Sequence, residues 1–432
     1  MSMFQIGLSG LKSTQSALEV TSNNIANYST SGFKSGTTEF ASVYNGGQRG
    51  GVKVADVKDN FSESGEMVNT GNALDLAIAG KGFFTVEETD GQLAYTQAGQ
   101  FSLDNNLYVV NANGARLQGY GVDDSDDSSI VSGILTDLKI EGSNLGAKPT
   151  DGIAFSGNLS SSSDVIAYPA LPVLFDPTNG SAYNYSQSTE VYDSLGNSHV
   201  ITQYFNHTNT NTWSAMYFVD GQPLSASDLS FPGGGGTIST QDVDINGTAV
   251  TAGVVEMSFD ADGQLIPFGS ENEVQLSFAP GGGAANMNVT FDLTNTTQYG
   301  SSFAMYENDP NGYTAGEFSG VTVDEDGKVY ATFTNGESKL QGQLVLASFA
   351  NVDGLQQGNN TVYYNTQESG APLYGVPGTG VAGDLLSGSY MGSNVNISEQ
   401  LVDLMSFQQN YQANAKTISS ADEMMQILFG AV

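Results

Sequence analysis

The residues that could do acid–base or nucleophilic chemistry are few. The 432 residues include two histidines, His199 and His207, and no cysteine. The histidines lie in a stretch rich in Asn and Thr, and no Gly-x-Ser-x-Gly nucleophile elbow accompanies them. The lack of cysteine excludes disulfides and thiolate metal sites. We therefore predict no catalytic residue and a protein that is not an enzyme.

Two acidic segments superficially resemble calcium loops. They are Asp123–Asp127 and Asp324–Gly327, and neither continues to the bidentate Glu that closes an EF-hand loop. Asp-Gly is more often a hairpin turn, so hairpins are the favoured interpretation and calcium is the alternative. The glycine clusters at 233–236 and 281–283 do not lead from a strand into a helix with Lys or Ser/Thr, so they predict no phosphate site. We expect no metal and no cofactor.

The charge balance excludes several classes of partner. The chain has 12 Lys and Arg against 46 Asp and Glu, a formal charge of −34, so phosphate backbones and anionic lipids would be repelled. No run of about 20 apolar residues is present, and the amino terminus does not have the pattern of a cleaved signal peptide. We predict no nucleic-acid binding and no membrane insertion. The length and the 39% hydrophobic content predict two to four folded domains.

The last forty residues predict a long helix with a coiled-coil seam. No Pro or Gly interrupts Ile397 to Phe429, and Asn396 is placed to cap the first free N–H groups. Such a helix would be about 48 Å long at 1.5 Å per residue. Seam residues alternate in steps of three and four: Leu401, Leu404, Gln408, Tyr411, Ala415, Ile418, Asp422, Met425 and Phe429. A helix with one apolar seam needs a partner.

The amino terminus supplies a second helix with the same periodicity. Its seam residues are Phe4, Leu8, Leu11, Gln15, Leu18, Ser22 and Ile25. Gly7 and Gly10 each cost this helix roughly 1 kcal/mol relative to Ala, so it should form only when packed on something. We predict that the two terminal helices pair. The alternative is that both are ordinary amphipathic helices covering a globular core.

Between the helices the pattern is that of short strands joined by tight turns. Apolar and polar residues alternate, and Asn-Gly or Asp-Gly pairs separate the strands, as at Asp220-Gly221, Asn246-Gly247 and Asp353-Gly354. The pattern of strands and turns changes near residues 148 and 300, which places domain boundaries there. We predict a multidomain α+β fold in which a terminal coiled coil encloses two mainly antiparallel β domains. The predicted parts are residues 1–30 with 390–432 as the helical domain, 31–70 as an extended connection, 71–147 with 301–389 as an inner β domain, and 148–300 as an outer inserted β domain.

Four segments resemble the bacterial flagellar axial proteins, the rod and hook family. They are residues 7–34, 69–84, 342–380 and 393–418, and the VYDSLGNSH segment at 191–199 is similar to hook members in particular. The departures are Tyr28 in place of a small residue, Gln409 in place of a common Arg, and an FGAV ending in place of a basic tail. These departures affect individual subunit contacts rather than the family.

The resemblance implies a structural subunit that assembles with itself into the hollow, flexible flagellar hook, a universal joint that passes motor torque to the filament. The implied partners are further copies of the chain, rod proteins, the hook cap, hook–filament junction proteins and the flagellar export apparatus. Export without a cleaved signal peptide would place the protein outside the cell, at the hook of the flagellar basal body. The self-assembly seam would comprise Phe4, Leu8, Leu11, Leu18, Ile25, Leu401, Leu404, Tyr411, Ala415, Ile418, Met425 and Phe429. A rod subunit of the same family is the nearer alternative, and a secreted β-rich adhesin or carbohydrate-active protein is the more distant one.

Overall fold

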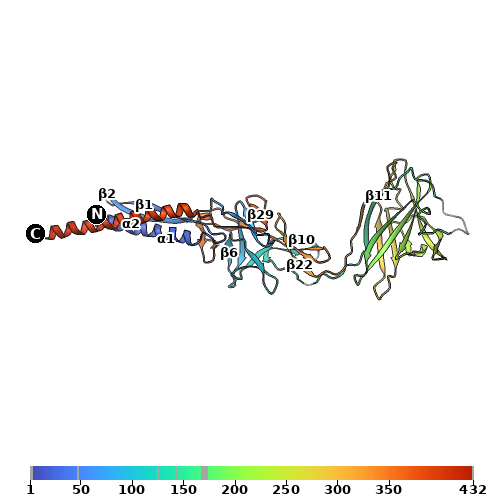
Figure 1. Cartoon of the computed structure of the whole chain (residues 1–432), viewed down its shortest axis with the longest axis horizontal. Helices are drawn as coiled ribbons and strands as arrows, with labels where there is room; N and C mark the ends of the chain where they lie inside the picture. The colour runs from blue at the N-terminus through green and yellow to red at the C-terminus, as the bar shows by residue number, and fades with distance from the viewer. Residues whose placement is uncertain (1–2, 46–47, 124–125, 143, 167–173, 431–432) are drawn as a thin grey trace. The chain divides into compact units, whose positions relative to one another are not determined.

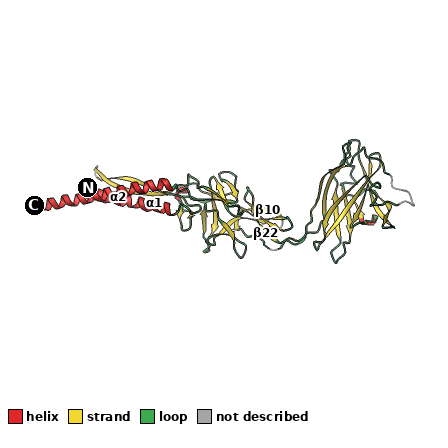
Figure 2. Cartoon of the chain, viewed as in Figure 1, coloured by secondary structure: helices red, strands yellow, loops and turns green. Residues whose placement is uncertain are grey.

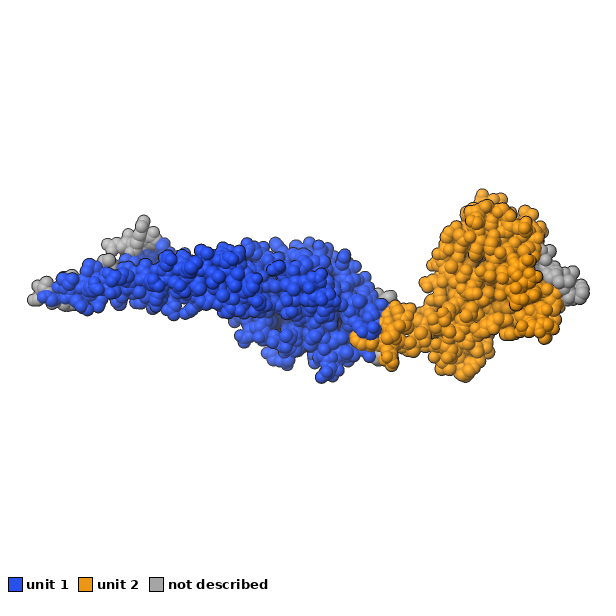
Figure 3. Space-filling model, in the orientation of Figure 1, with its two compact units in different colours: residues 1–142, 319–332, 338–432 blue, residues 143–318, 333–337 orange. Residues whose placement is uncertain are grey.

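The chain divides into two compact units. The computed structural model describes residues 3–45, 48–123, 126–142, 144–166 and 174–430. Unit 1 comprises residues 1–142, 319–332 and 338–432, and unit 2 comprises residues 143–318 and 333–337 (Figure 3). Both ends of the chain belong to unit 1, so unit 2 is an insertion within it. The insertion begins a few residues before the predicted boundary at 148 and extends past the predicted end at 300.

Two helices close unit 1 at one end. Helix α1 (Met3–Ala26) and helix α2 (Ile397–Gly430) lie side by side and run in opposite directions (Figure 1). Asn396 caps α2 as predicted: its Oδ1 accepts the backbone N–H groups of Ser398 at 3.1 Å and Glu399 at 3.4 Å. Helix α2 has 34 residues against 24 in α1, so one helix extends beyond the other. Within the described residues, no helix is both long and apolar enough to cross a membrane.

A long antiparallel hairpin packs along α1. Strands β1 (Gly36–Asn45) and β2 (Gln48–Asp59) pair from Gly36↔Asp59 to Asn45↔Gln48. Asn24 of α1 holds the base of the hairpin, because its Oδ1 accepts the N–H of Gly36 and its Nδ2 donates to the Gly36 carbonyl. Much of the segment predicted as an extended connection is therefore an ordered β-hairpin that contacts the amino-terminal helix.

The remainder of unit 1 is β structure (Figure 2). A 13-stranded sheet has the main order β22-β23-β24-β9-β5-β6-β27-β26, and two further strand pairs are β29-β4 and β3-β30. The strands are β3 (Met67–Asn69), β4 (Leu76–Ala79), β5 (Phe83–Glu87), β6 (Leu93–Thr96), β7 (Phe101–Leu103), β8 (Val109–Asn111), β9 (Arg116–Asp123), β10 (Asp126–Asp137), β22 (Phe318–Val323), β23 (Lys328–Phe333), β24 (Ser338–Leu344), β25 (Leu346–Ser348), β26 (Gln356–Gln357), β27 (Val362–Tyr364), β28 (Leu373–Gly375), β29 (Asp384–Ser387) and β30 (Ser389–Met391). Strands from before and after the insertion pair directly, as in β24 with β9 and β29 with β4.

Unit 2 is a sandwich of two sheets. A five-stranded sheet has the order β16-β19-β20-β11-β21, and a six-stranded sheet has the order β12-β13-β14-β18-β17 with β15 beside β14. The strands are β11 (Gly152–Asn158), β12 (Tyr185–Tyr192), β13 (Ser198–Asn209), β14 (Thr212–Val219), β15 (Gln222–Pro223), β16 (Leu229–Ser230), β17 (Ile238–Ile245), β18 (Thr248–Ser258), β19 (Glu273–Phe278), β20 (Met287–Asp292) and β21 (Ala304–Pro310). Side chains from both sheets, including Phe155, Trp213 and Phe291, form the core between them.

The turn residues confirm two of the predicted hairpins and correct a third. Asn246 and Gly247 join β17 to β18 with φ of 55° and 84°, and Asp220 and Gly221 join β14 to β15 with φ of 48° and 78°. Two central residues with positive φ suit the right-handed twist of the strands, which is why Asn-Gly and Asp-Gly are favoured there. Asp353-Gly354 is instead part of a short 3-10 helix, η2 (Val352–Gly354), and a second 3-10 helix, η1, spans Ala226–Asp228. Overall the chain is mostly β with a helix at each end.

Candidate assembly interface

Small residues form the face of α1 that contacts α2. Gly7, Gly10, Thr14, Ala17, Thr21 and Asn24 are all buried and recur at steps of three and four. A Cβ added to Gly7 would lie 2.9 Å from Ile418 Cγ1, and one added to Gly10 would lie 2.7 Å from Asn414 Oδ1. The two backbones therefore approach closely, and glycine is needed at both positions. The sequence by itself identifies these glycines as a cost to the helix, although the recurrence of small residues at steps of three and four is a usable signal of a close helix contact.

Polar side chains fix the register of the helix pair at one end and near the middle of both helices. Asn24 Nδ2 donates to Gln400 Oε1 at 2.9 Å, and Asn414 Nδ2 lies 3.5 Å from Thr14 Oγ1. Buried side-chain amides and hydroxyls need such partners, so a slip of one turn would leave them unpaired. The α1 side of the interface with α2 is thus lined by small and polar side chains, and it is not the apolar zipper that the predicted seam suggests.

The structure separates the predicted seam residues into two groups. Leu11, Leu18, Ile25, Leu404, Ala415 and Ile418 are partly buried, whereas Phe4, Leu8, Leu401, Tyr411 and Met425 are exposed. The side chain of Phe429 lies outside the described residues. Both helices therefore present large apolar side chains to solvent after they have packed on each other. Other exposed apolar residues of the two helices, outside the predicted seam, are Ile6, Ile397, Val402, Met405, Met424 and Ile427. Such a surface on a folded chain is typical of an interaction site.

A junction of hydrogen bonds joins the helical end to the β part of unit 1. Ser35 N donates to Asn394 Oδ1 at 2.7 Å, and Asn394 Nδ2 donates to the Asn60 carbonyl at 2.8 Å. Lys34 is buried here, its Nζ donates to the Glu63 carbonyl at 3.0 Å, and burial lowers the pKa of its amine to about 8. The chain segments that enter and leave the helical end are therefore hydrogen-bonded to one another beside the β part of unit 1.

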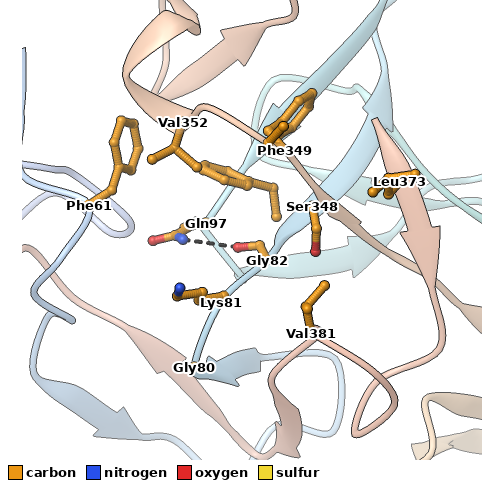
Figure 4. A pocket seen from close by; sticks show the side chains of 12 residues that line it. Phe61, Gly80, Lys81, Gly82, Gln97, Ser348, Phe349, Val352, Leu373 and Val381 are labelled. Carbon is orange, nitrogen blue, oxygen red and sulfur yellow. Dashed lines mark hydrogen bonds between the residues drawn. The ribbon is translucent and has the colours of Figure 1, made fainter. Parts of the chain in front are cut away.

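An apolar pocket of about 380 Å³ lies in the β part of unit 1 (Figure 4). Phe61, which follows β2, packs edge-on against Phe83 with ring centroids 5.6 Å apart. Gln97 Nε2 donates to the Gly82 carbonyl at 2.9 Å, and Lys81 is the one charged residue in the lining. Leu373 and Val381 are largely exposed. The pocket suits an apolar side chain and holds no pair of groups for acid–base chemistry.

The two histidines occupy structural positions in unit 2. His207 is buried, its ring stacks on Trp213 at 4.8 Å, and its Nδ1 lies 2.9 Å from the Ser163 carbonyl. His199 lies between two carboxylates, with Nδ1 at 2.7 Å from Asp220 Oδ2 and Nε2 at 3.5 Å from Asp193 Oδ2. It thereby links the turn after β12 to the turn after β14. Neither histidine has the nucleophile and base arrangement of a hydrolase.

We expect the stability of unit 2 to fall as pH rises through neutrality. Partial burial opposes protonation of His199, but its hydrogen bonds to Asp220 and Asp193 outweigh this effect and raise its pKa above the ordinary 6.5. The ion pairs are therefore fully present below about pH 6.5 and are lost as pH rises through the raised pKa. Trp213, the single tryptophan, is buried in unit 2, so its fluorescence during urea unfolding reports this unit. His199→Gln should flatten the profile between about pH 6 and pH 8. Equal slopes for both proteins would contradict the role of His199.

The acidic segment 324–327 is a turn. Asp324 Oδ1 accepts the N–H of Lys328 at 2.7 Å, and the Asp324 carbonyl accepts the N–H of Gly327 at 3.1 Å. This loop joins β22 to β23, as the hairpin interpretation requires. Residues 124 and 125 of the other acidic segment lie outside the described residues. Across the part of the chain that the structure describes, no three His, Asp or Glu side chains gather as a metal site.

Four family models match successive parts of the chain. The flagella basal body rod protein model matches residues 4–34, and the flagellar hook protein FlgE/F/G D1 domain matches 77–145. The flagellar basal body protein FlaE D2 domain matches 158–313, and the flagellar basal body rod FlgEFG protein C-terminal model matches 386–430. The matches fall on α1, the β part of unit 1, the sandwich of unit 2 and α2. The fold and these matches define an axial protein of the flagellum.

Full-length relatives narrow this class. The chain is 34% identical over 429 residues to the flagellar hook protein FlgE of Escherichia coli (strain K12), covering 98% of each chain. It is 33% identical over 426 residues to that of Salmonella typhimurium and 30% identical over 449 residues to that of Borreliella burgdorferi, covering 98% of this chain in both cases. A crystal structure of Helicobacter pylori flagellar hook protein FlgE2 has a TM-score of 0.50 at 13% identity, covering 74% of this chain and 98% of that one, which supports the fold. The chain belongs to the flagellar hook protein family, a family of structural proteins of the flagellum.

Proposed function

We propose that this chain is the repeating subunit of the flagellar hook, a hollow and flexible tube that passes torque from the motor to the filament. Membership of the hook protein family supports the role in the flagellum. The observation that carries self-assembly is the row of exposed apolar side chains on α1 and α2. Leu401 is 46% exposed and Met405 is 54% exposed, although each is large and apolar and lies well inside its helix. Contact with neighbouring copies would remove these surfaces from water.

In the proposed mechanism each helix has two contact faces, one for the other helix of the same chain and one for neighbouring copies. The inner face of α1, made of small residues, holds α2 of the same chain. The outer faces carry the exposed residues of the predicted seam, such as Leu8 and Leu401, and pack on helices of neighbouring copies in a coiled-coil arrangement. Because an isolated helix with two glycines is marginal, ordering of the helical end is coupled to polymerisation. The β domains then lie between the helical layer and solvent and slide on one another as the tube bends.

Further partners follow from the family. The subunit would add at the rod, beneath the hook cap, and would later contact the hook–filament junction proteins. A chain without cysteine needs no disulfide formation after transport, which suits passage through the flagellar export apparatus in an unfolded state. The proposed location is the extracellular hook of the basal body.

A substitution on the outer face tests the proposal. Leu401→Asp should abolish tubes in electron micrographs and in sedimentation of concentrated protein, because a charge would be desolvated at each contact between copies. The Trp213 unfolding transition should not change, because Leu401 is exposed on α2 in unit 1 while Trp213 is in unit 2.

The matched control is Ser406→Asp, which places the same charge at an exposed polar position of the same helix, outside the predicted seam. Tubes from Leu401→Asp as abundant as those from Ser406→Asp would show that the outer face of α2 does not mediate assembly. Loss of tubes with both variants would point to the total charge rather than to the face.

A further inference from the structure

A groove lies between α1, the β1–β2 hairpin and α2. Its volume is about 460 Å³, and none of its lining residues is charged. We call it the α1–hairpin groove. Ile6 and Phe40 are 41% and 46% exposed at its edge, Val52 and Phe407 add to the apolar lining, and Gly10 and Gly51 leave room in it. In a chain with a formal charge of −34, an uncharged, open groove with large apolar side chains needs a physical reason.

The same molecule carries an apolar surface that could fill such a groove. Ala421 is buried, but Met424, Met425 and Ile427, which follow it on α2, are 47%, 53% and 72% exposed. We call residues 422–427 the α2 overhang. Because α1 begins at Met3 and Gly7 of α1 lies opposite Ile418, the overhang extends past the end of its helical partner. Its methionines are flexible and adapt to irregular apolar surfaces.

We propose that the α1–hairpin groove of one copy binds the α2 overhang of a second copy. This inference rests on the proposed self-assembly and identifies one contact that would produce it. Groove and overhang are different surfaces of one chain, so the contact is heterologous. A heterologous contact leaves a free groove at one side and a free overhang at the other, and it can therefore extend into an open helical polymer. A contact between identical surfaces would stop at a dimer.

Charge complementarity favours this occupant. The first 59 residues, which include α1 and the hairpin, hold five of the 12 Lys and Arg but only four of the 46 Asp and Glu. Lys12 and Lys53 are exposed, and each is next in sequence to a residue of the groove lining. The overhang begins with the acidic pair Asp422 and Glu423. An acidic and apolar helix end thus meets a region of a strongly acidic chain in which basic residues outnumber acidic ones.

The helix geometry predicts the displacement between neighbours. Met425 follows Asn410, which lines the groove, by 15 residues along α2. This spacing corresponds to about 22 Å at 1.5 Å per residue. Two copies in the proposed contact are therefore displaced by about 22 Å along the helix axis. The second copy lies beside the first, displaced so that its overhang is level with the groove.

Disulfide trapping tests the contact in the full chain, which has no cysteine of its own. Phe40→Cys and Met425→Cys are prepared separately, mixed in equal amounts, polymerised and oxidised. Up to about half of the chains should form Phe40→Cys/Met425→Cys heterodimers, because random mixing places the reactive pair at a quarter of the contacts. Mixed preparations exclude bonds within one chain. The matched control mixes Met425→Cys with Tyr306→Cys, a more exposed position in unit 2, and should give no such heterodimer.

The outcomes separate this inference from the proposed function. Polymers without the heterodimer, or with Met425→Cys homodimers in its place, overturn the groove–overhang contact and leave self-assembly standing. Failure of the unmodified chain to polymerise overturns both. If either cysteine variant alone prevents assembly, Val52→Cys and Ile427→Cys replace the pair, and the heterodimer is again the result that supports the contact. A disulfide requires Cβ atoms about 3.5–4.5 Å apart, so trapping reports a direct contact.

Discussion

Gly10→Val is expected to separate α1 from α2 and to abolish polymerisation. A Cβ at this position would lie 2.7 Å from Asn414 Oδ1 and 2.9 Å from Asn414 Cγ, so the branched side chain cannot be accommodated without displacing Asn414 or the helix. Overpacking of this kind costs about 1–3 kcal/mol, which a pair of marginal helices cannot absorb. Far-ultraviolet circular dichroism should show lost helix, and electron microscopy should show no tubes.

The control for this prediction is Glu19→Val, at an exposed position of the same helix outside the predicted seam. Valine lowers intrinsic helix propensity there, but no close contact with α2 is involved. This variant should retain its helical signal and its tubes. If Gly10→Val also retained both, the close approach of the two helices would not be a requirement of assembly. A gain in helicity from Gly10→Val would have the same meaning, because glycine would then be only a local cost.

Removing the helical end altogether should leave a folded monomer. A chain of residues 60–395 keeps the sandwich core of unit 2 and the aromatic cluster around Phe83, Tyr95 and Tyr363. It lacks α1, α2 and the β1–β2 hairpin, and with them the proposed seam, the groove and the overhang. Sedimentation should show a monomer at concentrations that polymerise the full chain.

The Trp213 transition of the truncated chain should shift by less than about 2 °C, since a change of 1 kcal/mol moves the midpoint of a unit of this size by about 2–4 °C. A larger loss would mean that the helices stabilise the β domains, which is the alternative of amphipathic helices covering a common core. Tubes formed by residues 60–395 would instead place the assembly surfaces on the β domains.

Several features follow from the sequence alone because they depend on local chemistry. An uninterrupted run after Asn396 specifies a capped helix, and Asn246-Gly247 specifies a two-residue turn, since few residues adopt positive φ at both central positions. The two histidines and the lack of cysteine predicted that no catalytic residue, disulfide or thiolate metal site would be present. The four matching segments indicated the family. All of these signals come from composition or from continuous segments of sequence, and none requires knowledge of contacts between distant segments.

Other features were decided only by tertiary contacts. The spacing of apolar residues predicted that one face of α1 is buried, but it could not identify the partner that buries it. In the structure Gly7 and Gly10 face α2 and Leu8 faces solvent, because close approach of two backbones outweighs the local propensity that counts glycine as a defect. The hairpin at residues 36–59 and the limits of the insertion likewise depend on pairing with distant segments. The periodicity of the sequence therefore determined which helices form. Packing between segments about four hundred residues apart determined which faces of these helices remain exposed.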